Sequence, residues 1–233
     1  ESFMSYKVAL IDDDASLTEL LSEFLVAENF SVQVSNDGLE GFDSITSNKP
    51  DIVVLDIMMP HMNGIEVLKR IRSKSLLPVI LLTAKGDDAD CVLGLELGAD
   101  DFVTKPCSPH ALVARIRAIL RRTDVKNNPS QAPIPILAGP LKLYTTRRRI
   151  ECDGAALELT STEFNLLEIL IINAGQVVKK STLSKEGIGR PLTPFDRIVD
   201  VHISSIRNKI RHMPDGGSLI KTVFRKGYQL SVE

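Results

Sequence analysis

Long apolar stretches are missing from this 233-residue sequence. No uninterrupted apolar run comes near the roughly 20 residues that a membrane-spanning helix needs. The start of the chain also lacks a basic segment followed by a hydrophobic stretch and a cleavage site. We therefore expect a cytoplasmic protein that has no membrane partner.

Cysteine is scarce and follows no recognisable pattern. Cys91, Cys107 and Cys152 are odd in number and fit no metal-binding or redox spacing. This favours buried or incidental thiols over disulfides. The sequence of residues 123–233 also lacks clusters of His, Cys, Asp and Glu at ligand or catalytic-triad spacing. The second half of the chain therefore gives no sign of an enzyme centre.

The chain is long enough for two domains of about 100 to 120 residues each, and its charge is unevenly divided. Residues 1–122 hold 12 Lys and Arg against 19 Asp and Glu, a net charge of −7. Residues 123–233 hold 16 against 11, a net charge of +5. The asymmetry indicates an acidic, cation-binding or regulatory half joined to a half that meets a polyanion.

The first half alternates short apolar runs with amphipathic stretches, which is the rhythm of strand and helix in an α/β fold. The apolar runs lie at residues 8–11, 30–34, 52–55, 78–82 and 101–104. The helical patterns lie near residues 15–27, 38–47, 65–73, 88–97 and 109–121. Five buried strands, each followed by a helix, predict a doubly wound parallel sheet within a domain of residues 4–122.

Residues 123–136 form the predicted flexible linker, because they hold three prolines with Asn, Ser and Gln and show no apolar period. Beyond the linker, residues 137–233 begin with short alternating segments and end in a hairpin-like segment. Three helices are expected between these ends, at residues 161–173, 180–187 and 195–212. This order predicts a small α+β domain.

Polar and charged residues follow the strands of the predicted parallel sheet. They are Asp12, Asp13, Asp14, Asp56, Thr83 and Lys105. Ligands of a doubly wound sheet bind outside the carboxyl ends of the strands, so we expect these side chains to converge there. A single Asp after a strand is usually a turn residue or a helix cap, and Asp14 is expected to be only a cap.

The convergence of several carboxylates has a chemical consequence. Carboxylates that are brought together raise one another's pKa unless a cation neutralises them. Mg²⁺ prefers one or two carboxylates with waters and a phosphate, so Asp12 and Asp13 are expected to hold Mg²⁺. A carboxylate can also accept a phosphoryl group while an ammonium neutralises the transferred oxygens. We therefore predict that Asp56 is the acceptor and Lys105 the fixed cation.

Five motifs of the first half resemble the receiver domain of two-component response regulators, a flavodoxin-like (βα)5 fold. They are IDDD at 11–14, VVLDIMMP at 53–60, NG at 63–64, LLTAK at 81–85 and GADDFVTKP at 98–106. The resemblance implies that a sensor histidine kinase phosphorylates Asp56. It also implies that the backbone carbonyl of Met58 joins Asp12, Asp13 and Asp56 as a Mg²⁺ ligand.

The same resemblance implies a switch. Thr83 is expected to follow the phosphoryl group while Phe102 turns inward, which carries the signal to the face formed by residues 88–122. A cis peptide bond is expected between Lys105 and Pro106.

The face formed by residues 88–122 carries both signs of charge, which would let it pair with a copy of itself. The charged residues are Glu96, Asp100, Asp101, Arg115, Arg117, Arg121 and Arg122. A solvated charged face is the plainer interpretation, since exposed ion pairs contribute little. The resemblance implies a homodimer on phosphorylation, with Asp101 and Arg115 as the first pairing to carry over. Cys91 and Ala111 stand where relatives carry an Arg and a Glu that pair, so that salt bridge is absent here.

Residues 195–212 predict an amphipathic helix with one packing side and one basic, hydrogen-bonding side. Ile198, Val201, His202 and Ile206 share the packing side, and Arg197, Ser204, Ser205 and Arg207 lie elsewhere on the helix. Such a helix suits the major groove of double-stranded DNA, where Arg, Asn and Ser can reach base edges or phosphates. The terminal hairpin places Arg225 and Lys226 at a tight turn, where they are expected to reach sugar-phosphate or the minor groove. A solvated charge run is the alternative for this tip.

Four motifs of the second half resemble the OmpR/PhoB-type winged helix-turn-helix domain. They are LTSTEFNLLEIL at 159–170, GQVV at 175–178, DRIVDVHISSIRNKI at 196–210 and TVFRKGYQL at 222–230. The loop RPLTPFDR at 190–197 looks like that of the Cpx-type envelope-stress regulators. The resemblance implies that Arg197, His202 and Arg207 contact phosphate or base and that Thr222 contacts phosphate. It implies that residues 188–194 face RNA polymerase.

Two departures from the winged-helix pattern concern DNA recognition. Ser204 and Ser205 occupy positions that are often Arg or Asn, and Phe224 with Arg225 replaces a usual Arg-Gly pair in the wing. Base specificity and minor-groove contact therefore do not transfer from the family.

The sequence as a whole predicts a transcription regulator. Phosphorylation of Asp56 is expected to favour dimerisation and binding to direct repeats in promoter DNA. A phosphatase or phosphotransferase built on the receiver is one alternative, and it lacks a second catalytic centre. A DNA-binding protein with a degenerate, unphosphorylated receiver is the other, and the intact acidic cluster argues against it.

Overall fold

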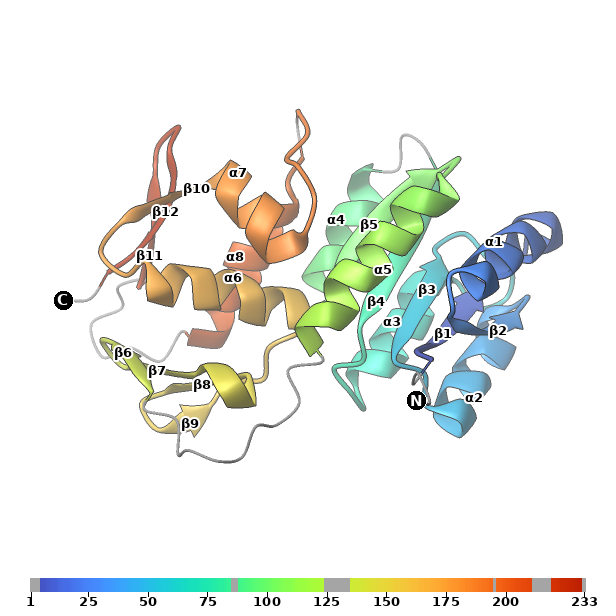
Figure 1. Cartoon of the computed structure of the whole chain (residues 1–233), viewed down its shortest axis with the longest axis horizontal. Coiled ribbons are helices and arrows are strands. Elements are labelled where there is room, and N and C mark those ends of the chain that lie inside the picture. The colour runs from blue at the N-terminus through green and yellow to red at the C-terminus, as the bar shows by residue number, and fades with distance from the viewer. Residues whose placement is uncertain (1–4, 85–87, 124–134, 195, 211–218, 232–233) are drawn as a thin grey trace. The chain divides into compact units, whose positions relative to one another are not determined.

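The computed structural model describes residues 5–84, 88–123, 135–194, 196–210 and 219–231 (Figure 1). The chain divides into two compact units, Glu1–Leu120 and Arg121–Glu233. We call the first the receiver unit and the second the effector unit. Among the described residues, no helix is both long and apolar enough to cross a lipid bilayer.

The receiver unit is built on a parallel sheet of five strands in the order β2-β1-β3-β4-β5. The strands are β1 (Lys7–Ile11), β2 (Ser31–Ser35), β3 (Ile52–Asp56), β4 (Val79–Ala84) and β5 (Asp101–Lys105). This is the flavodoxin-like order. The strand that follows β1 lies on one side of it, and the later strands are added on the other side, beginning with β3. The predicted doubly wound fold is therefore confirmed, and the order leaves a ligand crevice between the carboxyl ends of β1 and β3.

Five helices cover the two faces of this sheet (Figure 1). They are α1 (Ala15–Ala27), α2 (Gly38–Asn48), α3 (Gly64–Arg72), α4 (Asp88–Glu96) and α5 (Pro109–Thr123). Side chains of α1 and α5 share one apolar core with the sheet. Because both faces are covered, Val53, Val54 and Leu55 of β3 are completely buried.

Side-chain caps explain where three of these helices begin. Asp14 accepts a hydrogen bond from the Leu17 N–H at the start of α1, so its predicted role as a cap is confirmed. Asp37 caps α2, and Asn63 caps α3 by accepting from the Glu66 N–H. A cap satisfies backbone N–H groups that the helix itself leaves without partners. The ends of the preceding loops are thereby fixed next to the sheet edge.

The effector unit begins with an antiparallel sheet and continues with helices. The sheet contains β6 (Ile136–Ala138), β7 (Leu141–Tyr144), β8 (Arg149–Cys152) and β9 (Ala155–Ala156), with the short helix η1 (Thr145–Arg147) between β7 and β8. The helices that follow are α6 (Ser161–Ile172), α7 (Lys180–Thr182), the π-helical turn η2 (Leu183–Ile188) and α8 (Ile198–Ile210). The helix predicted at 180–187 is thus one short α-helical turn that continues as a π-helix.

A second sheet closes the effector unit in the order β10-β12-β11. Its strands are β10 (Val177–Lys179), β11 (Ile220–Val223) and β12 (Gly227–Leu230). The hairpin of β11 and β12 is the wing expected from the sequence. Most of the predicted linker, residues 124–134, lies outside the described residues, as do residues 195, 211 and 212 of the helix predicted at 195–212.

Candidate functional site

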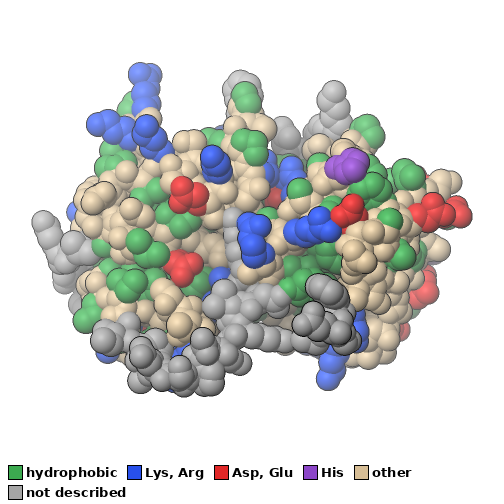
Figure 2. Space-filling model, viewed as in Figure 1, with side chains coloured by type: hydrophobic (Ala, Val, Ile, Leu, Met, Phe, Trp, Pro, Cys, Tyr) green, Lys and Arg blue, Asp and Glu red, His purple; other side chains and the backbone are tan. Residues whose placement is uncertain are grey.

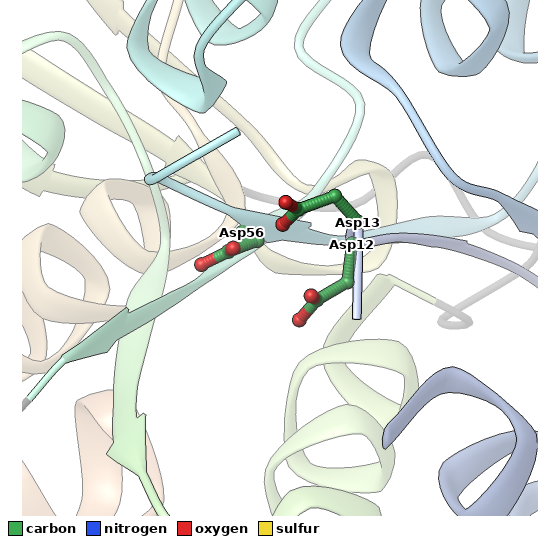
Figure 3. A group of neighbouring side chains, drawn as sticks. All are labelled: Asp12, Asp13 and Asp56. Carbon is green, nitrogen blue, oxygen red and sulfur yellow. The ribbon is translucent and has the colours of Figure 1, made fainter. Parts of the chain in front are cut away.

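Three aspartates meet at the carboxyl edge of the receiver sheet (Figure 3). Asp12 and Asp13 directly follow β1, and Asp56 is the last residue of β3. One carboxylate oxygen from each lies within 4.8 Å of the others. Asp12 and Asp56 are buried, whereas Asp13 is exposed. The predicted convergence of these carboxylates is therefore present in the structure.

Lys105 is the cation of this cluster. Its Nζ lies 2.6 Å from Oδ2 of Asp12 and 3.1 Å from Oδ2 of Asp56. The Lys105 side chain is one-quarter exposed, so solvent reaches it from one side. One ammonium thus pairs with two of the three carboxylates, and the cluster keeps a surplus of negative charge.

The pKa values of both Asp56 and Lys105 are shifted within this cluster. Burial and the neighbouring Asp12 raise the pKa of Asp56 above its ordinary value of 3.8, although Lys105 and a backbone hydrogen bond from Met58 act against this. Burial lowers the pKa of Lys105, but the hydrogen bonds and charges of Asp12 and Asp56 outweigh burial, so the pKa is raised. Lys105 therefore stays charged at neutral pH, while Asp56 is held in an electrostatically unfavourable state.

The absence of a side chain at Gly64 allows α3 to start close to the end of β3. Gly64 begins α3, and a Cβ at that position would lie 2.0 Å from the backbone oxygen of Asp56. The Asn63-Gly64 pair therefore caps α3 and lets the helix start directly against the end of β3. On the other side, the predicted cis peptide bond between Lys105 and Pro106 is confirmed.

The cluster fits a divalent cation. Carboxylate oxygens are the ligands that Mg²⁺ and Ca²⁺ prefer, and three of them converge here with only one ammonium to balance them. A hard cation at this position would offset the burial and the repulsion from Asp12 that raise the pKa of Asp56.

The predicted switch residues lie beside the cluster. Thr83 is fully buried near the end of β4, where its hydroxyl donates to the Ala84 carbonyl at 3.3 Å. Phe102 lies in β5 and is half-buried. Met58 lies two residues after Asp56 with an exposed side chain, as expected for a residue that contributes only its backbone.

Three of the residues expected at the dimer face are exposed. These are Glu96 at the end of α4 and Arg117 and Arg121 in α5. Asp101 and Arg115 pair within one chain, with 2.7 Å between Nη1 and Oδ2, and the side chain of Asp101 is 2% exposed. Cys91 is buried and Ala111 is exposed.

Asp100 and Arg117 lie elsewhere than the sequence led us to expect. Asp100 is completely buried, where its carboxylate accepts from the Val79 N–H at 3.0 Å and lies 3.3 Å from Nη2 of Arg72. It therefore braces the start of β4 and is not part of an exposed face. Arg117 points to the other side of α5, where Nη2 lies 2.6 Å from Glu28 at the end of α1. A helix turns by about 100° per residue, so Arg115 and Arg117 leave α5 in different directions.

The effector helix α8 separates into a buried and an open side. Arg197, just before the helix, and Ser204 are exposed. Ser205 is half-buried and donates its hydroxyl to Glu163 of α6 at 2.6 Å. His202, which the resemblance assigns to DNA, is fully buried within the effector unit. It shares the packing side with Ile198 and Ile206, which is the side that the helical period assigns to it.

Arg207 and Thr222 link α8 to the wing. The Arg207 guanidinium donates to the Ile220 carbonyl at 2.9 and 2.7 Å and to the Thr222 hydroxyl at 2.8 Å. It also lies 5.5 Å from the ring centre of Tyr228. The two residues expected to contact phosphate therefore hold each other in place, while Arg225 and Lys226 are exposed at the wing tip.

Sequence reasoning missed two polar centres of the effector unit. Glu163 receives hydrogen bonds from the Thr160 N–H, Ser205 and Lys209. Asp200 pairs with Lys180 at 2.6 Å and accepts from the hydroxyl of Tyr228. The Thr-x-x-Glu spacing of residues 160–163 is a capping-box signal that could have located the first. The second joins residues far apart in sequence, and no local pattern marks it.

Comparisons with known proteins agree with this geometry. The family described as "Response regulator receiver domain" matches residues 8–117, and the family described as "Transcriptional regulatory protein, C terminal" matches residues 154–230. The chain is 46% identical to the transcriptional regulatory protein CpxR of Escherichia coli over 226 residues, which cover 95% of this chain and 97% of that protein.

Two further relatives match this chain over almost its whole length. The alkaline phosphatase synthesis transcriptional regulatory protein PhoP of Bacillus subtilis is 39% identical, with 97% of each chain covered. The solved structure of the response regulator DrrB, a Thermotoga maritima OmpR/PhoB homolog, is 33% identical with a TM-score of 0.52. That match covers 98% of this chain and 100% of the other.

Proposed function

This chain belongs to the OmpR/PhoB-type two-component response regulators and is CpxR-like, and from that premise we propose that Asp56 is its phosphoacceptor. The family consists of transcription factors rather than enzymes, and its members couple a receiver to a DNA-binding domain. We assign residues 4–122 to the receiver, 123–136 to a linker and 137–233 to the DNA-binding domain.

The acidic cluster with Lys105 is the observation that carries the proposal. Asp56 combines burial, a raised pKa and an ammonium 3.1 Å away. In the proposed step an oxygen of Asp56 forms a bond to phosphorus as the bond from phosphorus to a histidine nitrogen of the kinase breaks. The product is an acyl phosphate on Asp56, and Lys105 neutralises part of the charge on the transferred oxygens. Asp56 must be ionised to attack, which its pairing with Lys105 supports.

Asp12, Asp13, Asp56 and the Met58 carbonyl are the proposed Mg²⁺ ligands. When bound, Mg²⁺ would neutralise negative charge on the phosphoryl oxygens and on the three neighbouring carboxylates. Asp13 is exposed, so water and the phosphodonor can reach the proposed site from the Asp13 side.

Thr83 and Phe102 are the proposed switch, because Thr83 lies beside the acceptor in the sheet edge and Phe102 precedes the helix that carries Arg115. A phosphoryl group on Asp56 would draw the Thr83 hydroxyl away from Ala84 and free space for the ring. The proposed result is a homodimer through the face that holds Glu96, the Asp101–Arg115 pair and Arg121.

The proposed output is binding to double-stranded promoter DNA in the cytoplasm. Arg197, Ser204 and Asn208 are exposed at or on α8, where they are available to phosphates and base edges. Arg207 and Thr222 set the position of the wing relative to α8. We propose that residues 188–194 contact RNA polymerase.

The proposal is tested by binding of the full chain to a direct-repeat promoter fragment, with and without an acyl-phosphate donor and Mg²⁺. Asp56→Asn removes the acceptor, and Asp43→Asn is the matched control because Asp43 is an exposed aspartate on α2. We expect the donor to tighten binding about a hundredfold in the wild type and in Asp43→Asn, since dimerisation raises the effective concentration at the second half-site. Asp56→Asn should not respond.

Two results would overturn the proposal. Equal binding of all three proteins under all conditions would mean that the receiver does not control DNA binding. A phosphorylated Asp56→Asn protein, detected by intact mass, would mean that another residue accepts the phosphoryl group.

A further inference from the structure

A buried ion pair closes the loop between η2 and α8. Nη1 of Arg190 lies 2.6 Å from Oδ2 of Asp196. The side chain of Arg190 is 9% exposed and that of Asp196 is 2% exposed, so water screens their attraction little. Arg and Asp are rarely buried to this extent unless they are paired. Neither side chain is among the residues assigned above to DNA contact, phosphorylation or dimerisation.

Further hydrogen bonds tie the two partners to the helices on either side. The hydroxyl of Ser184, completely buried in η2, donates to the Arg190 carbonyl at 2.9 Å. At the other end, Oδ1 of Asp196 accepts from the Ile198 N–H at 3.0 Å, where α8 begins. Arg190 is thereby fixed to η2 and Asp196 to α8. The ion pair between them joins the two ends of the loop.

The support from which the loop leaves is anchored on α6. A Cβ at Gly187 would lie 2.4 Å from Cδ2 of Leu166, and the Gly187 carbonyl accepts from Nδ2 of Asn165 at 3.4 Å. Gly189, with a φ of +92°, ends the π-helical turn in the left-handed region that favours glycine. Because η2 is fixed in this way, the position of the loop depends on the contacts that the loop itself makes.

The outer side of the loop is apolar. Pro191 and Pro194 are exposed, and Leu192 is half-buried. Figure 2 shows hydrophobic side chains along this projecting loop. Leu192 also lines a groove of about 740 Å³ together with Val177 of β10 and Phe224 of the wing. Proline fixes its own φ, so the loop presents a nearly rigid apolar surface as long as its ends stay joined.

We propose that Arg190 and Asp196 form a latch that holds residues 189–194 in the conformation that RNA polymerase binds. The inference rests on the proposed contact between residues 188–194 and the polymerase. Arg190 is a positioning residue, since its buried side chain acts through the loop and not by touching the partner. A loop that is already ordered loses less conformational entropy on binding than one that must first be ordered. The latch therefore strengthens polymerase binding without adding a contact.

Substitutions can separate the latch from the start of α8. Arg190→Met keeps most of the side-chain length but removes the charge, while Asp196 still accepts from the Ile198 N–H. Asp196→Asn keeps an oxygen for Ile198 and also loses the ion pair. Both variants should loosen the loop and leave the beginning of α8, with Arg197 beside it, in place.

The test measures binding of RNA polymerase holoenzyme to a promoter fragment that the full-length protein already occupies, with an acyl-phosphate donor and Mg²⁺ present. Arg190→Met and Asp196→Asn should each weaken polymerase binding about tenfold, because the loop must be ordered on binding. DNA affinity should change by less than about twofold, since the cap of α8 remains. The double variant should bind polymerase no more weakly than either single variant, because all three lose the same interaction.

Two further variants complete the set. Arg190→Lys keeps a cation opposite Asp196 and should restore most of the polymerase binding. Arg149→Met is the matched control. Arg149 pairs with Glu151 at 2.7 Å in the first sheet of the effector unit, but half of its side chain is exposed. Its loss should leave polymerase binding at the wild-type level.

Amide hydrogen exchange shows whether the loop itself has loosened. In Arg190→Met the amides of Leu192, Thr193 and Asp196 should exchange about tenfold faster, while peptides from α6 and α8 exchange as in the wild type. Unchanged exchange in the loop would overturn the latch. If α6 and α8 also exchange faster, the double variant, which removes both charges, replaces Arg190→Met in the polymerase measurement.

The outcomes separate this inference from the proposed function. Leu192→Ala tests the polymerase contact directly, because it changes the surface of the loop and not the latch. If Leu192→Ala weakens polymerase binding but the latch variants do not, the latch is wrong and the polymerase contact stands. If the double variant alone binds like the wild type, a charge left without its partner explains the single variants, and the latch is again wrong. If neither Leu192→Ala nor the latch variants change polymerase binding, the proposed contact of residues 188–194 fails and the latch fails with it.

Discussion

Asp56 in the receiver and Glu163 in the effector unit are both almost fully buried, yet burial leaves them in opposite electrostatic states. Burial and Asp12 raise the pKa of Asp56, and its ammonium partner Lys105 is shared with Asp12. Burial also acts to raise the pKa of Glu163, but Lys209, Ser205 and the Thr160 N–H outweigh it and the pKa is lowered. Each oxygen of Glu163 has its own donors, whereas Asp12 and Asp56 share one ammonium, that of Lys105.

This difference distinguishes Asp56, which belongs to a candidate ligand site, from Glu163, which stabilises the fold. A buried carboxylate with a complete set of donors stabilises the fold and has nothing left to offer a ligand. A buried carboxylate whose negative charge is only partly balanced reduces stability, so such a group points to a function in which a ligand supplies the balancing positive charge. The comparison makes predictions about stability that differ in sign between the two units.

The largest expected effect is the loss of the brace at Glu163. Glu163→Ala should lower the stability of the effector unit by about 3 kcal/mol, because it leaves Lys209 and Ser205 without their acceptor and opens the capping box of α6. The chain has no tryptophan, so amide hydrogen exchange by mass spectrometry is the suitable measurement, read in peptides from α6 and α8.

Glu66→Ala is the matched control for this prediction. Glu66 also lies three residues after a helix cap, in α3, but its side chain is 52% exposed and its partner Arg70 is 3.8 Å away. Its loss should cost about 0.5 kcal/mol or less. Equal costs at both positions would show that the helix cap, and not the buried network, carries the stability at Glu163.

Mg²⁺ should produce the next largest effect, and only in the receiver. At about 100 times its dissociation constant the ion should stabilise the receiver by about 2.7 kcal/mol, while hydrogen exchange in the effector unit stays unchanged. A chelator should reverse the gain. Asp13→Ala should abolish the response with little change in metal-free stability, since the Asp13 side chain is exposed. Stabilisation of both units by Mg²⁺ would count against a site at the acidic cluster.

Asp56→Asn should raise the stability of the metal-free receiver by about 1 kcal/mol at pH 7, because it removes a buried charge and its repulsion from Asp12. The sign follows from the raised pKa of Asp56: the receiver gains stability as the pH falls from the raised pKa to the ordinary value of 3.8, and below 3.8 Asp56 is protonated in both the folded and the unfolded states. The advantage of Asp56→Asn should therefore shrink as the pH falls. Glu163 should behave oppositely, since its stabilisation is lost as the pH falls below its ordinary value of 4.5 and through its lowered pKa. Hydrogen exchange at pH 7 and at about pH 3.5 compares the two units, because the loss at Glu163 lies below pH 4.5. A destabilised Asp56→Asn receiver at pH 7 would contradict the prediction.

The sequence predicted most of the fold because the fold follows from local patterns. Apolar runs marked the five strands, of which β3 is buried along its whole length and β2 is largely exposed, and Asp14 marked the start of α1. Asp12, Asp13, Asp56 and Lys105 were predictable as a group, because parallel strands deliver their carboxyl ends to one edge.

Side-chain direction was harder to predict because it depends on partners far along the chain. Asp100 was read as a surface charge, yet Arg72 and the Val79 N–H hold it inside. His202 was assigned to DNA by resemblance, although the helical period had already grouped it with the apolar residues of α8. The π-helical turn Leu183–Ile188 has no period of its own in the sequence that would distinguish it from an α-helix.

The smallest expected effect concerns Arg117. Arg115 and Arg117 lie on the same helix, α5, and compare a buried ion pair with an exposed one. Arg115 faces the buried Asp101, whereas Arg117 faces Glu28 with half of its own side chain exposed. Arg117→Ala should therefore change receiver stability by no more than about 0.5 kcal/mol and leave phosphorylation-dependent dimerisation intact. Arg115→Ala should impair both, since it strands a buried carboxylate on the proposed dimer face. Sedimentation of the two variants with and without an acyl-phosphate donor measures dimerisation, and hydrogen exchange measures stability. Loss of dimerisation in Arg117→Ala alone would move the interface to the α1 side of α5, away from the face that Glu96 and Arg121 share.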